Sequence, residues 1–252
     1  MITDFFNHFD LVLATTPEQK RDVYHIRYQV YCDELGFEDK RQFKQPFERD
    51  GFDEHAHHFL IRHKRTGLAA GTARCVLPFD DFGHKKPLPS ERYCHHALDQ
   101  QQITSLGLRR GDYAEVSRIA IRAEFRRRIT LDHQQYTDHQ RFSFTQDELK
   151  SFSHIATALY FALASYYLMR DDIKTMIAMM EPRLMKHLNR AGIHFEPAGE
   201  LTEYHGLRQP FVLDKEKLKQ TIKPLFQPFF HLIDECINHE MMNSSVSARY
   251  IA

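Results

Sequence analysis

The segment from Tyr113 to Arg122 constrains the fold of this chain more than any other, because it combines an apolar run with charged side chains. Residues such as Val116 and Ile121 give the near-continuous apolar pattern of a strand that is covered on both faces. Glu115 and Arg118 interrupt that pattern, and an unpaired buried charge is strongly destabilising. We therefore expect a buried central strand whose charged side chains are paired or take part in chemistry.

The remaining patterns predict a mixed α/β fold, with one mostly antiparallel sheet flanked by helices. Thr16 and Pro17 mark the start of a helix that ends near Gly36. Residues 37–57 show no periodicity and are expected to form a long loop, of the kind that often serves as a lid or binding segment. The expected strands are 10–14, 58–62, 68–77, 113–122, 174–180, 195–203 and 207–213, and the later helices are 152–170 and 183–191.

The composition limits the class of protein. The 252 residues are 42% hydrophobic, enough for one large domain, expected over 1–213, with a helical extension over 214–252. Lys and Arg together number 34 and Asp and Glu together also number 34, so the charge implies neither a nucleic-acid nor a membrane partner. Four cysteines without CxxC spacing fit the reduced thiols of a cytoplasmic protein. We expect no signal sequence and no transmembrane segment.

Polar and aromatic residues of distinctive spacing precede the central strand. Arg27 and Tyr31 lie four residues apart, hence on one helix face, and Arg74 lies inside an apolar strand. Taken singly, these features also fit a surface arginine or an ion pair, for Arg74 with a loop acid or with Glu115. In combination they form an ordered set, which is Arg27, Tyr31, Phe37, Asp50, Asp53, Arg74, Glu115, Ser117 and Arg118.

This ordered set resembles that of the acyl-homoserine-lactone synthases, which are GNAT-like N-acyltransferases that take acyl chains from acyl carrier protein. The resemblance covers roughly residues 20–122. The segments Met180-Glu-Pro-Arg-Leu-Met-Lys-His-Leu and Glu203-Tyr-His-Gly-Leu-Arg-Gln-Pro are similar to the PEP-CTERM/exosortase system-associated acyltransferases, relatives of the N-acyl amino acid synthases. The resemblance implies a GNAT-like fold and transfer of a long-chain acyl group from acyl carrier protein to the amine of an amino acid or similar small acceptor.

The resemblance also implies roles for individual residues. Glu115 is expected to be the base that deprotonates the amine, directly or through a water, with Ser117 and Arg118 beside it in the catalytic group. Backbone N–H groups near Ile119 to Ile121 are expected to hold the tetrahedral oxyanion. The acyl chain is expected to lie between splayed strands, in a pocket lined by residues of 155–180. The residues expected to contact or enclose the acceptor are Arg27, Tyr31, Phe37, Asp50, Asp53 and Arg74.

The expected acyl donor is acyl carrier protein, with acyl-CoA as the alternative. GNAT enzymes that use coenzyme A usually carry a glycine-containing turn whose N–H groups cradle the pyrophosphate. This chain has Phe125-Arg-Arg-Arg-Ile129 there, without glycine, and a carrier-bound pantetheine arm has a single phosphate. A merely solvated basic surface is the other interpretation of these arginines. The residues expected to contact the donor or its carrier are Ile119, Ile121, Arg122, Arg126, Arg127 and Arg128.

Other functions remain open at this point. Tyr31 and Phe37 stand where homoserine-lactone synthases have Phe and Trp, and the chain has no Trp, so S-adenosylmethionine need not be the acceptor. The alternatives are a synthase that does use it, a coenzyme A-dependent acetyltransferase, and a non-catalytic acyl or carrier-protein binding module. The runs His55-Ala-His-His58 and Cys94-His-His96 lack the paired spacing of a zinc site. We expect surface or loop histidines there, no metal and no tightly bound cofactor.

Overall fold

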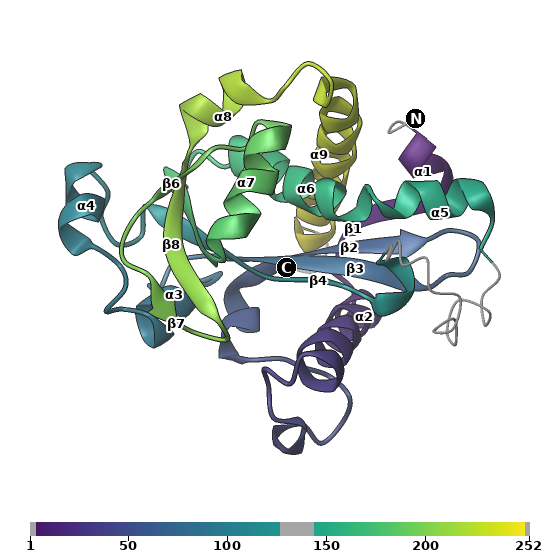
Figure 1. Ribbon diagram of the computed structural model, residues 1–252, viewed down its shortest axis with the longest axis horizontal. Helices are drawn as coiled ribbons and strands as arrows, with labels where there is room; N and C mark the ends of the chain where they lie inside the picture. Colours follow the sequence, from purple (N-terminus) through teal and green to yellow (C-terminus); the bar gives the residue numbers. More distant parts are fainter. Residues whose placement is uncertain (1–3, 127–143, 250–252) are drawn as a thin grey trace.

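The structure, a computed structural model, describes residues 4–126 and 144–249 and contains one twisted sheet covered by helices on both faces (Figure 1). The strand order is β1-β2-β3-β4-β5-β8-β6, with β7 paired to β8 beside this path. All pairs are antiparallel except β4 with β5. The predicted mixed, mostly antiparallel α/β fold is therefore confirmed. The strands are β1 Phe9–Leu13, β2 Ala56–His63, β3 Ala69–Val76, β4 Tyr113–Ile121, β5 Thr175–Met180, β6 Phe195–Pro197, β7 Thr202–Glu203 and β8 Leu207–Asp214.

The helices are divided between the two faces of the sheet. Figure 1 shows α6, α7 and α9 on one side and α2 on the other. The α-helices are α1 Phe5–His8, α2 Pro17–Arg27, α3 Pro89–Tyr93, α4 Gln100–Ser105, α5 Gln146–Phe152, α6 Ile155–Met169, α7 Pro182–Ala191, α8 Lys215–Thr221 and α9 Gln227–Arg249. Within the described residues no helix is long and apolar enough to cross a bilayer.

The first long helix begins as predicted but ends differently. Thr16 accepts a hydrogen bond from the Gln19 backbone N–H in a capping box, and Pro17 occupies the first turn. After Arg27 the helix widens into a π-helical segment, Tyr28–Glu34, instead of continuing as an α-helix to Gly36. Such bulges insert a residue into the helical ladder and often lie at functional sites. Here the widened end leads directly into the loop that borders the site.

The central strand β4 separates from its neighbour halfway along its length. It pairs with β5 only from Tyr113 to Val116, and its pairing with β3 shifts between Thr72 and Arg74. Between these two positions β4 contains one residue more than β3, so β4 has a β-bulge. Arg118 lies in this bulge, and its backbone is in the left-handed region, with φ +52°. A bulge bends a strand and redirects its side chains, which explains how a cleft opens between β4 and β5.

Burial along β4 follows this separation. Residues Tyr113–Glu115 are buried, whereas Val116 to Ile119 are only half-buried. The sequence predicts coverage on both faces along the whole strand, and that prediction is wrong for the second half, because β5 has turned away. The opened segment therefore borders cavities instead of a packed core.

The C-terminal residues pack onto the same core as the sheet. Asp214 ends β8 and caps α8 by accepting a hydrogen bond from the Lys217 backbone N–H. Helix α9 buries Phe229, Ile233 and Ile237 against the core that includes α6. The predicted helical extension over 214–252 thus begins where the sequence places it, and a division into domain and extension stays a prediction.

Candidate active site

A cluster of buried ion pairs connects α2, the loop that follows it, β3 and β4. The fully buried Arg27 guanidinium contacts Glu48 at 2.5 Å (Nε to Oε2) and Asp53 at 2.6 Å (Nη1 to Oδ1). Arg74 Nη1 lies 2.8 Å from the same Asp53 oxygen and 2.7 Å from Asp50 Oδ1. The predicted pairing of Arg74 with the loop acids is confirmed, and Glu115 is not its partner.

Local backbone structure fixes the two aspartates. The Asp50 carboxylate accepts a hydrogen bond from the Phe52 backbone N–H, and Asp53 accepts one from the Asp50 N–H, so both cap the 3₁₀ turn Gly51–His55. Burial alone would raise the pKa of Asp53, but the Arg27 and Arg74 guanidiniums outweigh it and hold that pKa well below its usual range. Asp53 therefore stays ionised between two buried cations.

Arg118 extends the cluster to the bulge of β4. Its Nη2 lies 2.6 Å from Glu38 and its Nε 3.3 Å from Glu48, and its guanidinium lies over the Tyr31 ring at 5.3 Å. Ser117 is tied in as well, since Arg74 Nε donates to its hydroxyl at 3.0 Å. Sequence analysis missed Glu38 and Glu48, because both stand in a loop without periodicity that would mark them.

Glu115 lies outside the ion-pair cluster and has different surroundings. Its side chain is 2% exposed, and one carboxylate oxygen accepts hydrogen bonds from the Ser90 backbone N–H at 2.8 Å and the Ser90 hydroxyl at 2.7 Å. Burial raises its pKa to about 7, although the Ser90 hydrogen bonds act in the opposite direction. Ser90, which lies on the short helix α3 and was not predicted to belong to the site, is thus the direct partner of the predicted base.

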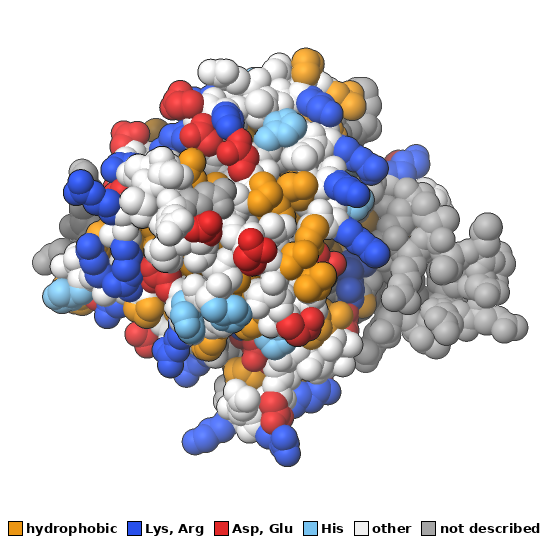
Figure 2. Space-filling model, turned by 60° about the vertical axis from the view of Figure 1, so that its left-hand side comes forward, with side chains coloured by type: hydrophobic (Ala, Val, Ile, Leu, Met, Phe, Trp, Pro, Cys, Tyr) orange, Lys and Arg blue, Asp and Glu red, His pale blue; other side chains and the backbone are white. Residues whose placement is uncertain are grey.

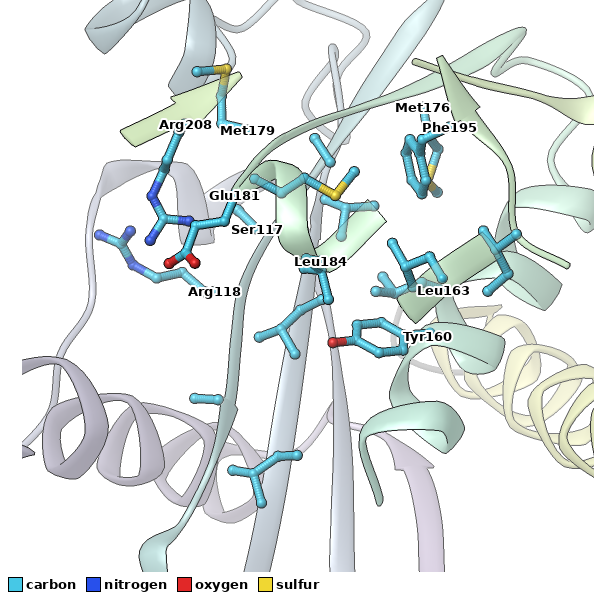
Figure 3. Close-up of a pocket in the computed structure, with 18 of the residues that line it drawn as sticks. Ser117, Arg118, Tyr160, Leu163, Met176, Met179, Glu181, Leu184, Phe195 and Arg208 are labelled. Carbon is cyan, nitrogen blue, oxygen red and sulfur yellow. The ribbon is translucent and has the colours of Figure 1, made fainter. Parts of the chain in front are cut away.

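Three cavities meet at Arg118, which lines all of them. The first, of about 440 Å³, is mostly apolar and lies in the cleft between β4 and β5 under α6 and α7. Figure 3 shows its polar end at Ser117, Arg118, Glu181 and Arg208 and its apolar end at Tyr160, Leu163, Met176 and Phe195. Residues of 155–180 do line this cavity, and that it holds an acyl chain stays a prediction; the lining residues from that range are Tyr160, Leu163, Ala164, Met176, Ala178, Met179 and Met180.

The other two cavities are lined by charged and apolar side chains together. A groove of about 1180 Å³ runs between the start of α2, the loop 38–50 and the side chains of Tyr93, Tyr204 and His205. A smaller chamber of about 90 Å³ is bordered by Glu115, Ser117 and Arg118 on one side and Arg208 on another. The described residues that complete this chamber are Tyr31, Phe37, Glu38, Pro89, Val116, Met179, Tyr204 and His205.

Aromatic contacts hold the walls of this chamber together. Phe37 stacks on His205 with ring centroids 5.1 Å apart, and Tyr31 donates a hydrogen bond from its hydroxyl to the Ile119 carbonyl at 2.8 Å. Tyr204 stacks on Tyr93 at 6.1 Å. The π-helical segment, the loop after it and the β7–β8 turn thereby enclose one site, although they lie far apart in the sequence.

The residues predicted to contact the donor lie at the first cavity or beyond it. Ile119, Ile121 and Arg126 line the cavity. The two described arginines are paired with acids, Arg122 with Glu124 at 2.5 Å and Arg126 with Glu34. Arg127 and Arg128 lie outside the described residues. Other Lys and Arg side chains gather beside exposed hydrophobic ones on the face shown in Figure 2.

The histidine runs do not form a metal site. Among residues 4–126 and 144–249, no three His, Cys, Asp or Glu side chains are grouped to hold a metal ion. The prediction of surface or loop histidines is wrong for His58, which is buried on β2 with Nε2 3.6 Å from Asp53 Oδ1. Burial lowers its pKa to about 3, so it packs as a neutral ring against the ion-pair cluster.

Comparison with known proteins agrees with this architecture. Residues 26–134 match the family model described as the acetyltransferase (GNAT) domain. TofI, solved in a ternary complex with an inhibitor and MTA, has 17% identity and a TM-score of 0.55, covering 86% of this chain and 98% of TofI. FeeM, an N-acyl amino acid synthase from uncultured soil microbes, has 16% identity and a TM-score of 0.53, covering 87% and 97%. MesI, a CoA-dependent acyl-homoserine lactone synthase, has 18% identity and a TM-score of 0.51, covering 84% and 93%. No curated protein sequence matches the chain.

Proposed function

We propose that this chain, which carries a GNAT acetyltransferase domain, moves a long-chain acyl group from acyl carrier protein to the amine of an amino acid or a similar small acceptor. The observation that carries the proposal is the meeting of an apolar cavity and a small chamber lined by charged side chains at the split between β4 and β5, with the buried Glu115 on the chamber wall. An acyl chain and an amine that enter from these two sides would meet beside Glu115.

Glu115 has the properties required of a general base. An amine is mostly protonated near neutral pH and must lose a proton before it attacks a thioester. A carboxylate with a pKa of about 7 can take that proton, directly or through a water. The nitrogen then attacks the carbonyl carbon, a C–N bond forms, the C–S bond breaks, and the pantetheine thiolate leaves and is protonated. Backbone N–H groups near Ile119 to Ile121 are the proposed donors to the oxyanion.

The apolar cavity supports an acyl group of some length. Its volume of about 440 Å³ lies within the range of about 300–1,000 Å³ that is usual for small-molecule sites. Each buried CH₂ contributes about 0.8 kcal/mol to binding, so a long chain gains affinity with every carbon that fits. The absence of glycine from Phe125–Ile129 supports acyl carrier protein as the donor and partner, with acyl-CoA as the second candidate.

A second function is favoured by one observation. The polar groove of about 1180 Å³ is much larger than the head group of an amino acid needs, and aromatic side chains of Tyr24, Phe43 and Phe47 line it. An acceptor with a nucleoside, such as S-adenosylmethionine in a homoserine-lactone synthase, would use that space. Association with an exosortase system and a cytoplasmic location stay predictions from the sequence.

Mass spectrometry of lipid extracts tests the proposal, using cells that express the wild type, Glu115→Gln or the control Glu54→Gln, which changes an exposed carboxylate. Long-chain N-acyl amino acids in the wild type and the control, but not in Glu115→Gln, would support the proposed reaction and base. Acyl-homoserine lactones would support the second function. If a folded wild type yields no acylated amine, the chain is better described as an acyl or carrier-protein binding module.

A further inference from the structure

We propose that Arg208 binds the carboxylate of the acceptor and so selects amino acids over other amines. This inference rests on the proposed function. It assigns the residue that positions the acceptor, a role not yet given to any residue of the site. Arg208 lies on β8, far in sequence from the residues of the ion-pair cluster, and lines both the apolar cavity and the small chamber.

The charges of the site single out this arginine. An arginine that recognises a substrate carboxylate needs N–H groups that are not already held by protein carboxylates. Arg27, Arg74 and Arg118 fail this condition, because each contacts at least two carboxylates. Their partners are Glu48 and Asp53 for Arg27, Asp50 and Asp53 for Arg74, and Glu38, Glu48 and Asp50 for Arg118.

Arg208 is held in place without being neutralised. Its Nε donates to the Tyr204 carbonyl at 2.9 Å and its Nη2 to the His205 carbonyl at 3.3 Å. These carbonyls belong to the β7–β8 turn, in which His205 and Gly206 have positive φ angles of 50° and 95°. Among the described residues, no carboxylate lies within 4 Å of its guanidinium. The turn therefore orients the guanidinium and leaves its charge for a ligand.

Among the described acids near Arg208, Glu38 and Glu115 line the chamber and Glu181 lines the apolar cavity, and none of them forms an ion pair with Arg208. Figure 3 shows the side chains of Glu181, Arg118 and Arg208 converging at the polar end of the apolar cavity. Glu181 follows β5 and is exposed, so water solvates its carboxylate. An acceptor carboxylate in the chamber would instead be desolvated, and a desolvated anion gains more from a nearby guanidinium.

The chamber fits the two charged groups of an amino acid. Glu115 and Arg208 both border its volume of about 90 Å³. An ammonium directed to Glu115 and a carboxylate directed to Arg208 are complementary in charge to these walls. The rest of the acceptor would extend into the polar groove, which shares Glu38, Arg118, Tyr204 and His205 with the chamber.

A competition between acceptors tests this assignment. The purified full-length protein is given hexadecanoyl acyl carrier protein with an equimolar mixture of one protein amino acid and its own carboxamide, tested in turn, because the two acylated products of each pair differ in mass. The wild type should favour the carboxylates. Arg208→Ala should lower the ratio of acyl amino acid to acyl amide on the order of 10- to 100-fold, since it removes a charged hydrogen-bonding partner. Arg208→Lys, which retains a point charge, should give a product ratio between those of the wild type and Arg208→Ala.

Two controls separate recognition from folding. Arg190→Ala removes an exposed arginine of α7 that lines none of the three cavities and should leave the ratio unchanged. Should Arg208→Ala unfold, Arg208→Gln serves in its place, with circular dichroism as the check. The assignment is overturned if a folded Arg208 variant keeps the wild-type ratio, or if the wild type does not distinguish carboxylate from amide. No acylated product at all from the wild type would instead refute the proposed function, and the assignment with it.

Discussion

Glu115 and Arg118 show how differently two charged residues of one strand can be accommodated. Arg118 is matched by carboxylates of Glu38 and Glu48, whereas Glu115 accepts hydrogen bonds from the neutral N–H and hydroxyl groups of Ser90. Burial without a nearby cation raises the pKa of a carboxyl group, whereas a nearby cation lowers that pKa. The site therefore contains Glu115, whose pKa is raised to about 7, beside Glu48 and Asp53, whose pKa values are lowered.

The pH dependence of the rate follows from this difference. A base works only when deprotonated, so the Glu115 contribution to kcat/KM should rise about tenfold per pH unit below about 7 and level off above it. Glu115→Gln lacks this group. The ratio of the wild-type to the Glu115→Gln rate, measured from about pH 5.5 to 8.5, cancels the titration of the acceptor amine itself. A ratio that does not change with pH would contradict the role of Glu115 as base.

The residues that could be recognised from the sequence are those whose type conflicts with their surroundings. Arg74 inside an apolar strand and Glu115 inside another predict partners, because buried charges need them. Glu38, Glu48 and Ser90 occur in segments where their types are ordinary, so no pattern marks them. Arg208 belongs to the Glu203–Pro210 segment that carries a family resemblance, but as one polar residue of a half-exposed strand it was not predicted to be a site residue. Only the tertiary structure brings these residues to the same chamber.

At the scale of elements, the existence of strands and helices was predictable and their irregularities were not. Apolar periodicity predicts α6, β5 and α7 closely. The bulge at Arg118 and the π-helical segment Tyr28–Glu34 do not change the spacing of apolar residues in the sequence, so the sequence does not predict them. Both depend on how neighbouring elements pack, and both contribute residues to the lining of the cavity between β4 and β5.

The ion-pair cluster that joins α2, the 3₁₀ turn and β3 should be important for stability. Asp53→Asn removes the carboxylate between the buried Arg27 and Arg74 guanidiniums, and breaking a buried pair on one side costs about 3–5 kcal/mol. Denaturant unfolding at pH 7 measures the change. Since the pKa of folded Asp53 lies below its usual 3.8, its contribution is complete at pH 7 and is lost as the pH falls below that value.

A matched control for this prediction is Asp39→Asn. Asp39 also pairs with an arginine, Arg41, but that pair lies on the surface, with the Arg41 side chain 90% exposed. Exposed pairs contribute little because water and salt screen them. The unfolding midpoint of Asp39→Asn should match that of the wild type. Equal effects of the two substitutions would contradict a special role for the buried cluster.

The apolar cavity between β4, β5 and α6 should set the length of the acyl chain. Leu163 lies on α6 at the apolar end of the cavity (Figure 3). Leu163→Phe adds volume there, so kcat/KM should fall for the longest acyl groups and remain for shorter ones, measured with a series of acyl carrier protein thioesters. Leu163→Met nearly conserves the volume and should keep the wild-type profile. A uniform loss across all chain lengths would point to misfolding instead.

At the scale of the whole molecule, the sheet and the C-terminal helices share one core. Helix α9 contacts α6 and β1, and the Glu240 carboxylate accepts a hydrogen bond from the Leu13 backbone N–H at 3.1 Å. Phe229 is fully buried and lies among aromatic rings of Phe5 and Phe161. The first and last described helices thus meet on one side of the sheet, which favours unfolding of the molecule as a single unit.

Phe229→Ala tests this cooperativity. Truncating a buried phenylalanine costs about 3–5 kcal/mol through lost burial and the cavity left behind. If the helical extension unfolds together with the sheet, circular dichroism and the alkylation of the buried Cys75 thiol of β3, read by peptide mass spectrometry, should report one transition, shifted equally for both signals. Glu235→Ala, on the exposed side of α9, should shift neither. If instead Phe229→Ala melts α9 early while Cys75 stays protected, residues 214–252 form a separate unit, and the active site should survive their loss.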